Sequence, residues 1–143
     1  MGDDASLEIY NTEQYTALVS DAIQQSGATQ VWLSSSELGR DLTPRVAARQ
    51  GVGALSDVTQ IEISGDEITA YRPCMSTKVI QKCKFSKDGL RVVSIRSGFF
   101  EAEETSPTPA ITVSLSIPEG HSKLKVKEVQ VEVSDEVELN EAR

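Results

Sequence analysis

The spacing of apolar residues changes once along the chain, near Gly51, and this change limits the folds that the sequence allows. Before that point apolar residues recur every three or four positions, as on one face of an α-helix. After it they alternate with polar residues, as in β-strands. A short apolar strand separates two helical segments in the first part, and this order predicts an α/β domain.

Two helices are predicted in the first part. Asn11–Gly27 carries apolar side chains at helical spacing, and its last residue, a glycine, stands where a left-handed C-cap is expected. Asp41–Gln50 is predicted as the second helix, ended by Gly51, and Pro44 is tolerated only in its first turn. Between them, Gln30–Ser34 is short, mostly apolar and bounded by turn residues, which predicts a buried parallel strand.

The second part predicts antiparallel strands. Val58–Ile63 and Glu67–Tyr71 alternate in polarity and are separated by a Ser-Gly-Asp sequence typical of a hairpin turn. Val79–Phe85 alternates as well, and a Lys-Asp-Gly turn leads from it into Arg91–Arg96. Three or four consecutive antiparallel strands are therefore expected.

Residues 101–143 are predicted to form a connecting region. Residues 101–109 contain three glutamates and two prolines, a composition typical of a surface connection. Ile111–Ile117 alternates like a half-buried strand, and the apolar residues on the two sides of Lys127 are in opposite phase, so a bulge or break is expected there. Asp135–Arg143 is acidic and has no core pattern.

Composition excludes several classes of function. The chain has 143 residues, the size of one domain, and 22 acidic against 14 basic residues give a net charge of -8. This charge disfavours binding to nucleic acid and to anionic membranes. No apolar run approaches the roughly 20 residues of a membrane helix, and the acidic start lacks the charge of a secretory leader. We expect a cytoplasmic protein, or a mitochondrial matrix protein if the source is eukaryotic.

No catalytic residues are expected. Ser34, Ser35 and Ser36 follow a strand, where α/β enzymes often place functional groups. They lack the flanking glycines of a nucleophile elbow, and the single histidine, His121, cannot complete a triad. The serines are better interpreted as loop hydroxyls that bond to backbone groups, so the sequence does not predict an enzyme.

Metal and phosphate sites are not indicated either. Cys74 and Cys83 lie nine positions apart, with no cluster of histidine or carboxylate at ligand spacing. An odd separation along one strand would place them on opposite faces, and we expect buried, unreactive thiols. Gly51-Val52-Gly53 follows a helix, whereas a phosphate-binding loop follows a strand.

The arginines are the remaining candidates for a functional surface. They lie at the ends of predicted elements in an acidic chain: Arg40, Arg45, Arg49, Arg72 and Arg96. Arg45 and Arg49 are one helical turn apart. The planar guanidinium suits carboxylate, phosphate and interface recognition. A solvated surface with weak ion pairs explains the same spacing, and the residues alone leave both interpretations open.

Several stretches of the sequence resemble one known protein family. The stretch Leu38–Thr59, LGRDLTPRVAARQGVGALSDVT, resembles the signature of the first domain of the electron transfer flavoprotein alpha subunit. Tyr71-Arg72-Pro73 resembles the family's Arg-Pro strand opening, and Val92–Arg96 followed by Phe99 resembles its Val-Arg strand. Val137–Arg143 resembles the residues ahead of the flavin domain. Met75–Lys78 departs from the pattern because it lacks the family's glycine, which puts a tight turn there in doubt.

The resemblance implies a Rossmann-like, three-layer α/β domain with a partly parallel sheet, followed by antiparallel strands and a β-rich connecting tail. Residues 1–104 would form the family's first domain without its opening βαβ unit. Residues 105–143 would form an acidic linker toward an FAD domain outside this chain. The whole protein would be a heterodimer with a beta subunit that carries electrons from flavin dehydrogenases on FAD, and this chain would be a scaffold within it.

The same resemblance implies the site residues and partners. Arg40, Asp41, Arg45, Arg49, Arg72 and Arg96 are expected to contact the beta subunit or the FAD domain, and no FAD is expected on this chain alone. Absence of the opening βαβ unit would leave a sheet edge unpaired, so a homodimer through that edge is expected. The alternatives are a stand-alone protein-interaction module without redox activity and, with less support, a nucleotide-binding domain.

Overall fold

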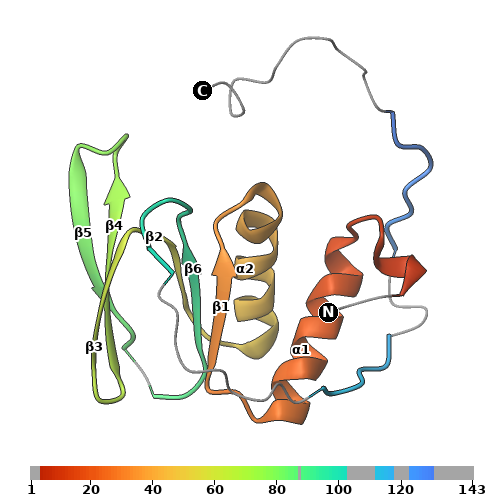
Figure 1. Cartoon of the computed structure of the whole chain (residues 1–143), viewed down its shortest axis with the longest axis horizontal. Helices are drawn as coiled ribbons and strands as arrows, with labels where there is room; N and C mark the ends of the chain where they lie inside the picture. Colours follow the sequence, from red (N-terminus) through yellow and green to blue (C-terminus); the bar gives the residue numbers. More distant parts are fainter. Residues whose placement is uncertain (1–3, 87, 103–111, 118–122, 131–143) are drawn as a thin grey trace.

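The computed structural model describes residues 4–86, 88–102, 112–117 and 123–130. Three layers form the body of the protein (Figure 1): two helices, a three-stranded parallel sheet, and a three-stranded antiparallel sheet on the far side. The predicted α/β fold with a partly parallel sheet is confirmed. The two sheets are called sheet A (parallel) and sheet B (antiparallel) below.

Helix α1 (Thr12–Ser26) agrees closely with the prediction and follows a short 3-10 turn, η1 (Ala5–Leu7). The Asn11 side chain accepts hydrogen bonds from the N–H groups of Glu13 and Gln14 and so caps the helix start. Gly27 ends it with a left-handed φ of 63°, as expected.

Strand β1 (Gln30–Ser34) pairs in parallel with β6 (Arg91–Ile95), which confirms a parallel strand. The prediction that β1 is buried is wrong. Its residues alternate between half-buried and exposed, and Trp32 keeps 39% of its surface accessible. The reason is position: β1 is the last strand of sheet A, and sheet B covers only the part of that sheet formed by β2 and β6.

Helix α2 (Glu37–Gln50) starts four residues before the predicted position. Ser36 is the N-cap and accepts a hydrogen bond from the Gly39 N–H. Pro44 therefore lies in the middle of the helix, and its expected place in the first turn is wrong. The early start depends on Gly39, where a Cβ would lie 1.7 Å from the Ser34 carbonyl oxygen, so only glycine lets the first turn approach the end of β1.

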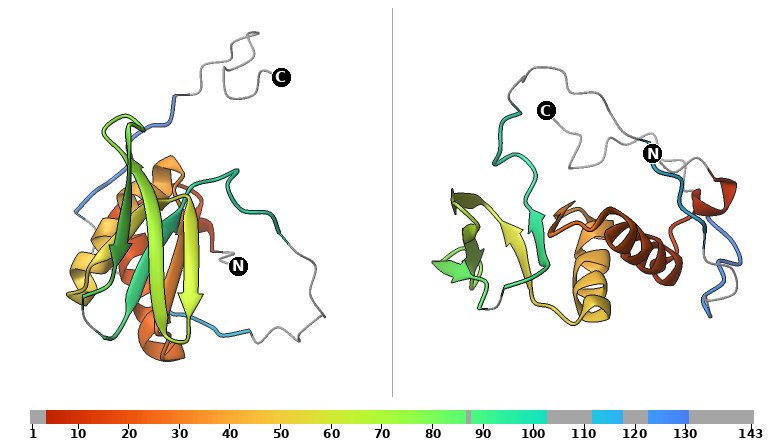
Figure 2. Two further views of the ribbon diagram at one scale, coloured as in Figure 1. Left: turned by 90° about the vertical axis from the view of Figure 1, so that its left-hand side faces the viewer. Right: turned by 90° about the horizontal axis from the view of Figure 1, so that it is seen from below.

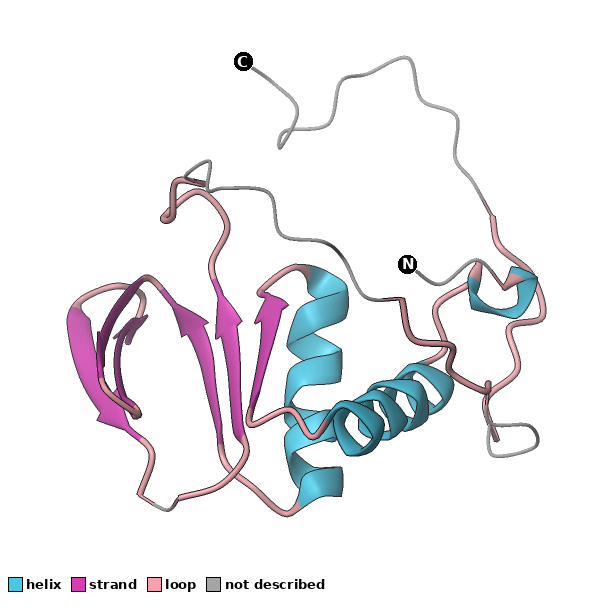
Figure 3. Ribbon diagram, turned by 60° about the horizontal axis from the view of Figure 1, so that its bottom comes forward, coloured by secondary structure: helices cyan, strands magenta, loops and turns pink. Residues whose placement is uncertain are grey.

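Sheet A has the order β1-β6-β2, with β2 formed by Ala54–Val58 (Figure 3). The crossover from β1 through α2 to β2 skips one position, and β6 fills it in parallel with both neighbours. The expectation that Arg91–Arg96 is antiparallel is wrong, and β2 was not predicted as a separate strand. Alternation identifies a strand but not its neighbours, which here are residues far away in sequence.

Sheet B consists of β3 (Gln60–Ser64), β4 (Glu67–Cys74) and β5 (Val79–Lys84), in that order. Its strands are antiparallel, so the hairpin and three of the expected antiparallel strands are confirmed. Sheet B packs on sheet A (Figure 2) through an apolar cluster that contains Val58, Ala70, Val93, Leu55, Ile61, Phe85 and Ile95.

The turn Met75–Lys78 between β4 and β5 forms without the glycine that the family shows there. Met75, Ser76 and Thr77 all have positive φ, at 51°, 53° and 67°. Left-handed backbone costs side-chain-bearing residues about 1 kcal/mol or more each. The ladder between β4 and β5 holds the turn in this conformation.

The tail differs from its prediction. Residues 112–117 and 123–130 are irregular, so the strand expected at Ile111–Ile117 is not formed in its described part. Val113 and Leu115 lie against α1 and the start of β1, and the Asn11 side-chain amide donates to the Leu124 carbonyl at 3.1 Å. Most of the expected connection at 101–109, and Asp135–Arg143, lie outside the described residues. Among the helices of the described chain, none is long and apolar enough to span a membrane.

Candidate partner-binding site

A hollow of about 530 Å³ lies between α2 and β2. Its lining is mostly apolar, and its polar residues come from α2 and from the carboxyl halves of β2 and β6. The lining residues are Arg40, Thr43, Pro44, Ala47, Ala48, Val52, Ala54, Ser56, Asp57 and Ser94. Concave sites of this size at the carboxyl end of a parallel sheet are common binding sites in α/β folds.

Asp57 stands at the polar end of this hollow in an unusual backbone conformation. Its φ is 61°, and the pairing of β2 with β6 shifts register between Leu55 and Val58. The Asp57 N–H donates to the Ser94 hydroxyl at 3.1 Å, and Ser94 in turn accepts from Ser35 at 3.0 Å. A strained residue persists where its surroundings determine its conformation, and these hydrogen bonds are part of that constraint.

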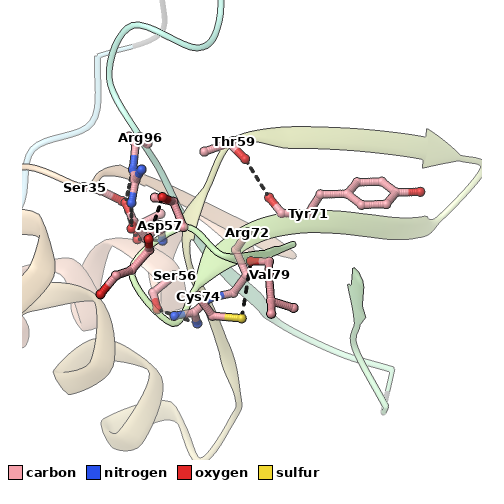
Figure 4. A network of polar contacts seen from close by, with 12 residues as sticks. Ser35, Ser56, Asp57, Thr59, Tyr71, Arg72, Cys74, Val79 and Arg96 are labelled. Atoms are coloured by element: carbon pink, nitrogen blue, oxygen red, sulfur yellow. Dashed lines mark hydrogen bonds and ion pairs between the residues drawn. The ribbon is translucent and has the colours of Figure 1, made fainter. Parts of the chain in front are cut away.

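Arg96 holds the Asp57 carboxylate by two contacts (Figure 4). Its Nε donates to Oδ1 at 2.9 Å, and Nη2 donates to Oδ2. These hydrogen bonds lower the pKa of Asp57, and the nearby positive charges of Arg40 and Arg72 act in the same direction. The Arg96 guanidinium also lies over the Phe99 ring, 5.9 Å from its centroid.

Arg72 and Arg40 complete the positive surroundings of Asp57. The Nη1 of Arg72 donates to the Ser56 hydroxyl at 3.1 Å, while its buried Nε has no hydrogen-bond partner among the described residues. Arg40 is exposed on α2 at the rim of the hollow and makes no ion pair with any described residue. Asp57, Arg40, Arg72 and Arg96 are called the Asp57 group below.

The other predicted site residues lie elsewhere on α2. The Arg45 Nε donates to Asp41 at 3.0 Å, one helical turn away, and the Tyr10 hydroxyl donates to the same carboxylate at 2.7 Å. The Thr12 side chain beside Asp41, together with hydrogen bonds from Tyr10 and Arg45, lowers the pKa of Asp41 to about 2. Arg45 and Arg49 line a shallow hollow beside α1.

The six residues expected at one interface therefore form two sets. The Asp57 group gathers residues from α2, from sheet B and from the loop after β6, whereas Arg45, Arg49 and Asp41 face α1. The importance of Asp57 was missed. The Ser-Asp pair at 56–57 was part of the family resemblance, but its left-handed backbone and its contact with Arg96 depend on the pairing of β2 with β6.

The serine loop after β1 has structural roles. Ser36 caps α2, which fits its interpretation as a loop hydroxyl that bonds to backbone. Ser35 is buried and donates to Ser94, and the Ser34 hydroxyl lies 3.4 Å from that of Ser97. His121 lies outside the described residues.

The cysteines differ from expectation. Both are half-buried, and they lie on the same face of sheet B, because Cys74 pairs with Val79 and Cys83 pairs with Ala70. The turn between β4 and β5 resets the phase that an uninterrupted strand would have kept. No group of three or more potential metal ligands occurs within the described part of the chain.

The loop at the carboxyl end of β1 does not fit the pyrophosphate of FAD. The loop after β1 carries three serines in place of the glycines that let a backbone approach a pyrophosphate closely.

Comparisons with known proteins agree on one family. Residues 1–134 match the profile of the electron transfer flavoprotein domain. The chain is 25% identical over 142 residues to the electron transfer flavoprotein subunit alpha of Bacillus subtilis (strain 168), covering 99% of this chain and 43% of that protein. It is 26% identical over 147 residues to Protein FixB of Clostridium saccharobutylicum, covering 100% of this chain and 44% of that protein. The chain thus spans less than half the length of these relatives.

Proposed function

Because the chain belongs to the electron transfer flavoprotein domain family, we propose that it is the scaffold part of an electron transfer flavoprotein alpha subunit. In this role it docks the beta subunit and supports the FAD domain while the complex carries electrons from flavin dehydrogenases. Residues 1–104 form the scaffold domain, and residues 105–143 lead toward the FAD domain. The complex works in the cytoplasm, or in the mitochondrial matrix of a eukaryote.

A scaffold role is consistent with the chemistry of the described residues. A cofactor supplies redox chemistry, so a protein region that positions it needs no acid, base or nucleophile of its own. The serines after β1 are engaged in capping and buried contacts. FAD is bound by the complete protein, and we expect this chain to purify without flavin. Flavin absorbance near 450 nm in a purified sample would contradict that expectation.

The Asp57 group is the main part of the proposed docking surface. Arg40 is an exposed cation with no ion pair among the described residues, at the rim of an apolar hollow in a chain of net charge -8. Arginine beside an apolar pocket is typical of the residues that dominate binding at protein interfaces. Arg72 and Arg96 are held by Ser56 and Asp57, so the surface around Arg40 is preorganised.

The second set contributes at the edge of the same interface. Arg45 and Asp41 pair with one another at the surface, so a partner gains less from contacting them than from contacting Arg40. Arg49 is exposed and lies one turn beyond Arg45. We expect charge reversal at Arg45 to weaken heterodimer assembly, and reversal at Arg40 to weaken it more.

Co-expression with the cognate beta subunit tests the proposal. Arg40→Glu and Arg45→Glu are compared with Lys82→Glu, a matched control on the exposed outer face of sheet B. We expect Arg40→Glu to reduce recovery of the complex at least tenfold, Arg45→Glu to reduce it less, and Lys82→Glu to have no effect. Normal recovery with both α2 variants would refute this interface.

The alternative is a stand-alone interaction module that never acts with flavin. The gene distinguishes the two proposals. A reading frame that continues into a glycine-rich flavin motif, beside a beta-subunit gene, supports the electron transfer role. A frame that ends at Arg143 in a genome with no beta-subunit gene supports the alternative.

A further inference from the structure

The hollow between α2 and β2 contains one charged side chain that the described protein leaves unpaired. Four of its polar lining residues make hydrogen bonds to other parts of the chain: Thr43, Ser56, Asp57 and Ser94. The remaining one is Arg40, which is exposed and whose guanidinium makes no hydrogen bond or ion pair with any described residue. An occupant of the hollow therefore meets one free charge, and that charge attracts an anion.

The surroundings of Arg40 favour an anion although the chain as a whole is acidic. Three arginines, Arg40, Arg72 and Arg96, lie around the single carboxylate of Asp57. Figure 4 shows that Arg96 holds this carboxylate and that Arg72 reaches Ser56 from sheet B. The local charge is thus positive in a chain of net charge -8. A second carboxylate is attracted here and repelled by much of the remaining surface.

The rest of the lining consists of small apolar side chains. They belong to Pro44, Ala47, Ala48, Val52 and Ala54, and they leave a hollow of about 530 Å³. A sugar or a nucleotide base would find few hydrogen-bond partners over this lining, and its unpaired polar groups would cost free energy. An apolar side chain would gain from burial in the same place. The hollow therefore suits an apolar group beside a carboxylate.

The proline in the middle of α2 adds a backbone acceptor beside the same hollow. In an α-helix the Arg40 carbonyl would accept from the N–H of residue 44, but Pro44 has no N–H. Both residues line the hollow, so the Arg40 carbonyl is an acceptor without its usual helical donor at this rim. A peptide segment suits the site, because it supplies a backbone N–H as well as side chains.

We propose that the hollow binds a segment of the beta subunit in which an acidic residue stands next to an apolar one. The carboxylate pairs with the Arg40 guanidinium, the apolar side chain lies over Pro44 and Val52, and a backbone N–H of the segment donates to the Arg40 carbonyl. The apolar side chain keeps water from the ion pair, which strengthens a pair that would gain little on an open surface. This inference rests on the proposed electron transfer role, because it names what the docking surface recognises on the beta subunit.

Photocrosslinking in the co-expressed complex identifies the segment. A p-benzoylphenylalanine replaces Val52, which is half-buried and lines the hollow. We expect a crosslink to one segment of the beta subunit, with Asp or Glu next to the apolar residue that reacts. The same group in place of Val79, an exposed residue of β5, is the control and should not react with that segment. A crosslinked segment without an acidic residue, or an assembled complex that gives no crosslink from residue 52, would overturn the proposal.

Exchange of charge tests the ion pair itself. Arg40→Glu, and replacement of the identified acidic residue of the beta subunit by lysine, should each reduce recovery of the complex by about tenfold or more. Together they form a pair of reversed polarity, so recovery should return to within about threefold of the natural complex. Lys82→Glu introduces the same charge on the outer face of sheet B and should not rescue the beta-subunit variant. A double variant that is recovered no better than its single variants would refute the pair.

A larger side chain in the hollow tests the apolar contact without a change at Arg40. Val52→Trp occupies part of the hollow and should reduce recovery of the complex by about fivefold or more, whereas Val79→Trp should leave it unchanged. Far-ultraviolet circular dichroism confirms that both variants fold. Full recovery with Val52→Trp would show that no side chain enters the hollow.

Failure of this inference can be told from failure of the proposed function. If the natural chain assembles with the beta subunit but the exchange of charge rescues nothing, the docking role stands and the acidic segment is wrong. If the natural chain recovers no beta subunit at all, the docking role fails, and the inference fails with it.

Discussion

Two aspartates of this protein are each held by an arginine, in very different settings. Asp41 pairs with Arg45 one turn away on α2, at a surface where their side chains are 41% and 51% exposed. Asp57 pairs with Arg96, 39 positions later, where the side chains are only 22% and 30% exposed. The first pair lies on the surface of a helix that forms without it, whereas the second connects the ends of two neighbouring strands.

The difference teaches where an ion pair affects structure. A helical pair at four-residue spacing gains a few tenths of a kcal/mol, because water screens it and the helix already holds both residues. The pair at Asp57 is less exposed, makes two contacts, and holds a left-handed residue at the register shift between β2 and β6. The geometry of the candidate site depends on this second pair.

Replacement of Asp57 should have the largest effect. Asp57→Ala leaves the Arg96 guanidinium without its partner and keeps a side chain in left-handed backbone, so we expect a loss of about 2–3 kcal/mol in the free energy of unfolding. Asp57→Gly also removes the ion pair but relieves the backbone strain, and should lose about 1 kcal/mol less. Urea denaturation measures both. Equal losses in the two variants would show that the backbone at residue 57 is not strained.

Acid should remove the contribution of Asp57. Its pKa is lowered in the folded protein, so the stabilisation is fully present above the unfolded value of about 4 and is lost as pH falls through the folded value. Asp57→Asn, which tolerates left-handed backbone, should be less stable than the natural protein at pH 7. The gap should narrow steadily below about pH 4 in denaturation curves, and a gap independent of pH would contradict the role of the charge.

The surface pair should show the smallest effect. We expect Arg45→Ala to change the free energy of unfolding by no more than about 0.5 kcal/mol, with the effect reduced further at high salt. Arg49→Ala, on the same helix but without an ion pair in the described structure, is the matched control. A loss above about 1.5 kcal/mol for Arg45→Ala would mean that the surface pair stabilises the fold about as much as the pair at Asp57, contrary to this prediction.

Much of the local structure could be predicted from the sequence, because it depends on residues close to one another along the chain. The start and end of α1 follow from Asn11 and Gly27, whose side-chain cap and left-handed backbone act within a few residues. The β3–β4 hairpin follows from Gly65 in the same way. The arginines were recognised as candidates by type and spacing, but their division into two sets was not.

The errors share a physical cause. Pro44 was placed in the first turn of α2 because the contact between Gly39 and the Ser34 carbonyl, which lets the helix start early, is not visible in a helical pattern. Trp32 was expected to be buried because an apolar strand resembles a central one, and only the extent of sheet B decides which part of sheet A is covered.

The sequence alone determined the α/β class, the positions of most helices and strands, and the family to which the chain belongs, since these depend on periodicity, capping and motif. Only the tertiary structure decided that β6 lies between β1 and β2, that Asp57 meets Arg96, and that β1 ends its sheet. Strand order and long-range ion pairs depend on contacts between segments tens of residues apart. Several such arrangements bury similar apolar area from the same local pattern, so the folded chain as a whole selects among them.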